Sequence, residues 1–170
     1  PAAPDAQRHA QLGAARRDQG VERGGVHADA GEVGLHALEE AAGLARGDRV
    51  ATLCNNSLEF LVAMFGIHRA GLIWVPINTG LGIDDVRYII DHSEARFVLV
   101  DAALMARADI AASVAKLPGR GWVLEGEGGG PFSAFSAALS AQPATETQVE
   151  IHDRDVAQIM YTSGTTGRPK

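Results

Sequence analysis

The sequence predicts an α/β fold in which a mostly parallel sheet is flanked by helices. From residue 35 onward, short apolar segments alternate with longer segments of helical periodicity, and strands that alternate with helices form parallel sheets. The composition is that of a globular domain, because 46% of the residues are hydrophobic and 21% are charged. A chain of 170 residues is long enough for one core of this kind.

The amino-terminal segment, residues 1–34, differs from the rest of the chain in composition. Its only large aliphatic residues are Leu12, Val21, Val26 and Val33. Such a segment buries too little apolar surface to offset the entropy that ordering it would cost. We therefore divide the chain into an irregular segment, 1–34, and a domain, 35–170, and expect the first to add little to the core.

The domain begins with a predicted helix at residues 35–45, where apolar residues recur at helical spacing and Gly47 follows the end. The short apolar run 49–54 is the first predicted strand. A second helix is predicted at 57–70, capped by Asn56. Apolar residues lie almost all round this helix, which predicts deep burial.

The alternation then continues. Residues 72–76 are a predicted strand, and Pro76 directs its end toward a sheet edge or a strand exit, because proline has no N–H to donate. A helix at 83–91 begins with two acidic residues near its positive end. Residues 96–100 are the next strand, and 102–117 an alanine-rich helix that ends before a proline.

The last third of the domain is less regular. A short strand is expected at 122–124, followed by a surface turn at 125–131 whose two glutamates would repel phosphate. Residues 132–150 resemble a weak helix and a linker. The last predicted strand, 156–161, is expected to be buried.

The residues after this strand, from Tyr161 to Lys170, combine hydroxyl groups, two glycines and two cations. Glycines let the backbone approach a ligand so that N–H groups converge on phosphate oxygens, while hydroxyl and ammonium groups add donors. We therefore predict a phosphate-binding loop, with an ordinary polar turn as the alternative. The predicted binding residues are Thr162, Ser163, Gly164, Thr165, Thr166, Gly167 and Lys170. The spacing is neither that of a P-loop nor that of a nucleophile elbow.

Residues 159–170 resemble the signature of the adenylate-forming superfamily, which includes acyl-CoA synthetases, luciferases and the adenylation domains of peptide synthetases. Shorter resemblances precede it in the order such enzymes show. They lie at residues 47–53, 56–60, 70–71, 75–78 and 88–93. Together they cover about residues 35–170.

The resemblance implies that the loop from Thr162 to Lys170 holds the β- and γ-phosphates of ATP, with Lys170 as the catalytic cation. A carboxylate would attack the α-phosphorus in the presence of Mg²⁺, giving an acyl-adenylate and pyrophosphate. The thiol of coenzyme A would then take the acyl group. The implied function is an ATP-dependent carboxylate–CoA ligase acting on fatty or other medium-to-large organic acids. The alternatives are an adenylation domain that loads a carrier protein, and a non-catalytic nucleotide-binding or structural fragment.

Two departures from the family pattern concern the ends of the chain. Residues 1–34 resemble nothing in that place, and a reading-frame error in the source gene is one hypothesis. The chain ends at Lys170, so the acceptor-binding region and the mobile lid of the family are expected to lie beyond it. We expect this amino-terminal piece to be inactive alone.

The composition also argues against other classes of protein. A net charge of −6 offers no basic surface for nucleic acid. Cys54 is the only cysteine, and we expect it to be a small buried residue. The longest apolar run, 60–67, is too short to span a bilayer, and residues 1–20 lack the apolar core of a signal peptide. We therefore expect a cytoplasmic protein, and we assign no metal ligand because the histidines lack paired spacing.

Overall fold

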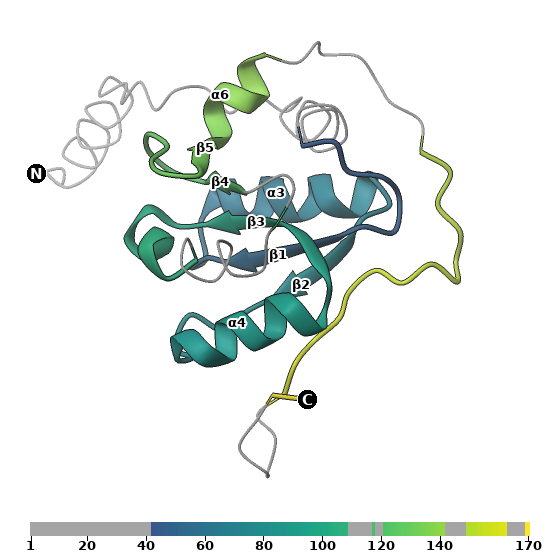
Figure 1. The fold of residues 1–170 in the computed structure, drawn as a ribbon. Helices are drawn as coiled ribbons and strands as arrows, with labels where there is room; N and C mark the ends of the chain where they lie inside the picture. The colour runs from purple at the N-terminus through teal and green to yellow at the C-terminus, as the bar shows by residue number, and fades with distance from the viewer. Residues whose placement is uncertain (1–41, 109–116, 118–120, 142–148, 163–168) are drawn as a thin grey trace, which may run out of the picture.

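The computed structural model describes residues 42–108, 117, 121–141, 149–162 and 169–170 (Figure 1). The predictions for residues 1–34, and for most of the helix at 35–45, lie outside this part. In chain order the elements are β1 (Arg49–Leu53), α3 (Leu58–Arg69), β2 (Ile73–Pro76), α4 (Ile83–His92), β3 (Ala95–Val100), the short 3-10 helix η2 (Ala102–Leu104), β4 (Gly121–Val123), β5 (Phe132–Ala134) and α6 (Phe135–Ser140).

The five strands form one sheet in the order β2-β1-β3-β4-β5, and every neighbouring pair is parallel. The predicted parallel sheet is therefore confirmed, and the strands expected at 49–54, 72–76, 96–100 and 122–124 all lie in it. Pro76 ends the edge strand β2, where a missing N–H costs little, as expected.

Alternate residues of the central strands enter two separate cores, one on each face of the sheet. On β3, Val98 and Val100 pack with Val86, Ile89 and Ile90 of α4. Phe97 and Leu99, which point the other way, pack with Ala63 and Ile67 of α3. The two helices thus cover opposite faces, as Figure 1 shows. Both faces of the central strands are apolar because parallel sheets of this kind are buried on both sides.

Two predictions for α3 are wrong. Its N-cap is Ser57, not Asn56, because the Ser57 hydroxyl accepts the backbone N–H of Phe60 at 3.1 Å. The helix is also not deeply buried: Leu58 and Phe65 are 59% and 57% exposed. Only one stripe of α3 reaches the sheet, so apolar residues on its opposite side remain open.

The outer elements depart further from the sequence-based prediction. Residues 42–45 are not helical. The helix predicted at 102–117 begins as η2 and continues as α-helix at 105–108, beyond which most of it lies outside the described part. Strand β5 was not predicted, because three residues are too few to show a period of two. The weak helix expected within residues 132–150 is present as α6.

The predicted strand at 156–161 is wrong as well. The segment is extended but makes only one isolated parallel bridge, between Gln158 and Trp74. It is also not buried, since Val156 and Met160 are 57% and 63% exposed. The segment lies outside the edge strand β2, and among the described residues no further strand pairs with its outer side.

We expect Gly121→Ala in β4 to lower the free energy of unfolding by about 3 kcal/mol, the upper end of the usual cost of overpacking. A Cβ at Gly121 would lie 2.2 Å from the carbonyl oxygen of Val98 and 2.7 Å from the Phe132 ring, so β3 and β4 would have to separate. Urea denaturation measures the loss.

Gly82→Ala is the matched control for this substitution. The nearest atom to its Cβ is an Asp85 carboxylate oxygen at 4.0 Å, so the loss should stay under about 1 kcal/mol. Equal losses for the two variants would contradict the close packing of β4.

Candidate functional site

The segment 149–162, whose middle lies beside the edge of the sheet, leads to the predicted phosphate loop (yellow in Figure 1). It lies beside β2, where the N–H of Trp74 donates to the carbonyl of Ala157 at 3.0 Å and the N–H of Ile159 donates to the carbonyl of Trp74 at 2.9 Å. These two bonds fix the middle of the segment relative to the sheet. We call residues 149–162 the edge segment.

An ion pair holds the edge segment upstream of this bridge. The Arg46 guanidinium contacts the Asp155 carboxylate at 2.5 Å, and the backbone N–H of His152 donates to the same carboxylate oxygen at 2.8 Å. The His152 N–H first, and then Arg46, lower the pKa of Asp155. Asp155 is therefore a charged acceptor at neutral pH.

An aromatic contact holds the other end of the edge segment. The Tyr161 hydroxyl lies 2.8 Å from Nδ1 of His92, the last residue of α4. The Tyr161 ring also packs against the core on the α4 side of the sheet. Thr162, the first residue of the predicted loop, comes directly after this contact.

The two ends of the predicted loop are joined by backbone hydrogen bonds. The N–H of Thr162 donates to the carbonyl of Lys170 at 2.8 Å, and the N–H of Lys170 donates to the carbonyl of Thr162 at 3.0 Å. Pro169, between the loop and Lys170, is buried. The structure therefore closes the loop at its base, which sequence reasoning did not anticipate.

Of the predicted site residues, the structure brings Thr162 and Lys170 together, and both are exposed. This pairing is between backbones, and the Thr162 hydroxyl also donates to the Lys170 carbonyl at 3.4 Å. A hydroxyl-bearing residue and a lysine that are both exposed and adjacent at one point of the backbone are suited to an anion such as phosphate. The other predicted residues, Ser163, Gly164, Thr165, Thr166 and Gly167, lie outside the described part.

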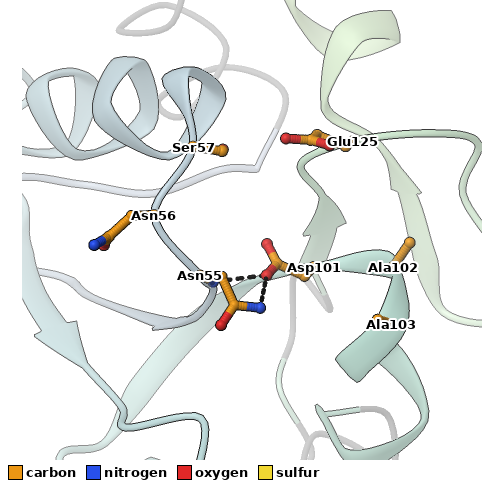
Figure 2. A pocket seen from close by; sticks show the side chains of 7 residues that line it. All are labelled: Asn55, Asn56, Ser57, Asp101, Ala102, Ala103 and Glu125. Atoms are coloured by element: carbon orange, nitrogen blue, oxygen red, sulfur yellow. Dashed lines mark hydrogen bonds between the residues drawn. The ribbon is translucent and has the colours of Figure 1, made fainter.

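A separate cavity of about 330 Å³ lies where β1, β3 and β4 end (Figure 2). Its lining consists of Asn55, Asn56, Ser57, Asp101, Ala102, Ala103 and Glu125. In a sheet of this strand order, chain connections leave in opposite directions on either side of the β1–β3 pair, and ligands commonly bind there.

The chemistry of this cavity does not suit phosphate. Asp101 accepts hydrogen bonds from the backbone N–H and the side-chain amide of Asn55, at 2.6 and 2.7 Å, so it closes the turn after β1 (Figure 2). Glu125 adds a second, exposed carboxylate. Two acids repel a polyanion, so the loop base remains the candidate phosphate site. The position of this cavity could have been predicted from the sequence, because Asn55 and Asp101 directly follow two predicted strands that are neighbours in the sheet.

Neither a metal site nor a membrane span is found in the described part of the chain. It contains no group of three or more His, Cys, Asp or Glu side chains that could hold a metal ion. Its helices are too short and too polar to cross a membrane.

The chain is similar to known proteins along most of its domain. The long-chain-fatty-acid–CoA ligase FadD13 of Mycobacterium tuberculosis is 38% identical over 132 residues, which are 76% of this chain and 25% of that protein. The 3-hydroxybenzoate–CoA/4-hydroxybenzoate–CoA ligase of Thauera aromatica is 37% identical over 131 residues, again 76% and 25%. The chain thus spans about a quarter of the length of these relatives.

Solved structures agree with the sequence relatives. The anthranilate CoA ligase AuaEII, in complex with anthranoyl-AMP, superimposes with a TM-score of 0.72 at 29% identity, over 83% of this chain and 27% of that one. The inhibitor-bound N-terminal domain of FACL13 from Mycobacterium tuberculosis gives 0.68 at 34% identity, over 83% and 34%.

The parallel sheet together with these relatives identifies the chain as an α/β protein of the adenylate-forming class. More particularly, the chain belongs to the family of AMP-binding enzymes, whose model matches residues 30–170. The resemblance read from the sequence is therefore confirmed. The match begins five residues before the predicted boundary at residue 35, and the division there stays a prediction.

We expect Cys54 to react slowly with iodoacetamide at pH 8. Cys54 is partly buried rather than fully buried as expected. Its burial first, and the charge of Asp101 second, raise the pKa of its thiol, and the Sγ–H donates to the carbonyl of Leu99 at 3.4 Å. Each pH unit below the pKa lowers the thiolate fraction about tenfold, so alkylation should be at least about tenfold slower than in the same chain unfolded in urea. Equal rates would show that Cys54 is accessible and ionised.

Proposed function

We propose that the protein to which this chain belongs is an ATP-dependent carboxylate–CoA ligase that acts through an acyl-adenylate. The observation that carries the proposal is the closed loop base, where Thr162 and Lys170 are paired and exposed. Membership of the AMP-binding family and the names of the relatives, which are CoA ligases, support it.

In the first step, a carboxylate oxygen of the acid attacks the α-phosphorus of ATP and pyrophosphate leaves. Lys170 and the Thr162 hydroxyl would hold the β- and γ-phosphates, with Ser163, Gly164, Thr165, Thr166 and Gly167 completing the loop. In the second step, the sulfur of coenzyme A attacks the acyl carbon and AMP leaves. Catalysis of the first step then consists of positioning and charge stabilisation, for which a loop of donors is sufficient.

Donor groups at the loop base fit ATP, because phosphate oxygens accept from hydroxyl and ammonium groups. We propose Mg²⁺ as the companion of the nucleotide, where it would neutralise phosphate charge. The described residues offer no cluster of carboxylate or imidazole ligands for the ion, so we assign no step of this chain to it. Fatty or aromatic acids are the proposed substrate class, by analogy with the named relatives. A cytoplasmic location stays a proposal.

In the complete protein, we expect Lys170→Ala to slow carboxylate-dependent ATP–pyrophosphate exchange by about ten- to a hundredfold, the value of one charge-assisted hydrogen bond. Thioester formation from preformed acyl-adenylate should change much less, because pyrophosphate has left before that step. The two half-reactions are measured separately.

Arg154→Ala is the matched control, because it removes an exposed cation from the same edge segment at a distance from the loop. It should leave both half-reactions unchanged. Equal losses in both half-reactions for Lys170→Ala, or a loss for Arg154→Ala as large as for Lys170→Ala, would contradict the assigned role of Lys170.

A further inference from the structure

The position of the loop base depends on how the edge segment is held just before it. The bridge to β2 ends at Ile159, three residues before Thr162, and three extended residues span roughly 10 Å. The ion pair of Asp155 with Arg46 lies further upstream. Among these described contacts, only those of Tyr161 adjoin Thr162 directly.

Tyr161 is held in two ways that can be separated by substitution. Its ring is partly buried against the core cluster on the α4 side of the sheet. Its hydroxyl lies 2.8 Å from Nδ1 of His92, and the two rings meet edge to face at 5.7 Å and 82°. A phenylalanine at position 161 would keep the packing and lose the hydrogen bond.

The imidazole of His92 is itself oriented by the helix that carries it. His92 stacks on Tyr88, four residues earlier in α4, with ring centroids 5.2 Å apart and an interplanar angle of 26°. Residues at this spacing lie on one face of a helix, so the stack holds the plane of the imidazole against Tyr88. The hydrogen bond therefore connects the loop to a rigid element of the domain.

Either group can be the donor in this hydrogen bond. Burial, and then Tyr88, raise the pKa of the Tyr161 phenol, so the hydroxyl stays protonated at neutral pH. It can donate to an unprotonated Nδ1 or accept from a protonated one. The contact between the two side chains is thus compatible with either tautomer of His92.

We propose that His92 and Tyr161 are a pair of positioning residues that fix Thr162 and Lys170 at the loop base before ATP binds. The inference rests on the proposed function, because the position of the loop matters only if it receives phosphate. Neither residue is catalytic. They hold the phosphate donors in place before ATP binds. The donors therefore lose less conformational entropy on binding, and ATP binds more tightly.

The test uses His92→Phe, Tyr161→Phe and the double variant of the complete protein. We expect each single substitution to lower kcat/KM for ATP in the pyrophosphate exchange reaction by about three- to tenfold, the range for one neutral hydrogen bond. Thioester formation from preformed acyl-adenylate should be unchanged. The double variant should lose no more than the worse single variant, because both remove the same bond.

A conservative variant and a matched control separate positioning from general damage. His92→Asn places an amide near the position of Nδ1 and should restore most of the loss seen in His92→Phe. His152→Phe makes the same exchange at an exposed histidine of the edge segment, whose backbone rather than side chain holds Asp155. It should behave as the wild type.

Each other outcome has a definite meaning. If the wild type catalyses pyrophosphate exchange and the Phe variants have the same kcat/KM for ATP, the positioning role is overturned and the proposed function remains. Equal losses in both half-reactions, losses that add in the double variant, or no rescue by His92→Asn would also overturn it. A wild type without any exchange activity would instead contradict the proposed function itself.

Discussion

The pairing of β1 with β3 is the interaction on which the rest of the described structure depends. The two strands are joined over five register positions, and their apolar side chains are almost completely buried on both faces. Strand β2 adds to the free side of β1, and β4 adds to the free side of β3. The edge segment in turn pairs with β2 through Trp74, whose indole N–H also donates to the Thr52 hydroxyl of β1 at 2.9 Å. The loop base therefore takes its position from the centre of the sheet through a short series of contacts.

The cavity at the strand ends and the loop base differ in the charge of their side chains. The cavity where β1, β3 and β4 end is acidic, since Asp101 and Glu125 line it. The loop base carries Lys170 and hydroxyl donors instead. An acidic chain of net charge −6 that binds a polyanion must do so with local donors, because its overall field is unfavourable. This constraint supports our proposal that the phosphates bind at the loop, whose sequence supplies hydroxyl groups, glycines and a lysine.

Strands and helices with a repeated apolar pattern could be predicted from the sequence. Features that depend on one tertiary or capping contact could not. The apolar runs of β1, β2 and β3 and the helices between them could be predicted, because burial on both faces requires continuous apolar strands. Strand β5 has only three residues, and the capping role of Ser57 rather than Asn56 depends on one hydrogen bond. The binding role of the loop residues was predicted from composition and resemblance, and it stays a prediction. The pairing of Thr162 with Lys170, and the contact of Tyr161 with His92 across 69 positions, follow from tertiary structure and leave no local pattern.

The central claim is that the base of the loop, Thr162 and Lys170, receives the terminal phosphates of ATP. Amide hydrogen exchange of the complete protein, compared with and without nucleotide, tests it most directly. The account predicts that ATP slows exchange in the peptide containing residues 160–170, that pyrophosphate does so in part, and that AMP leaves this peptide unchanged. Protection by AMP equal to that by ATP, or ATP protection confined to the acidic cavity around Asn55 and Asp101, would contradict it.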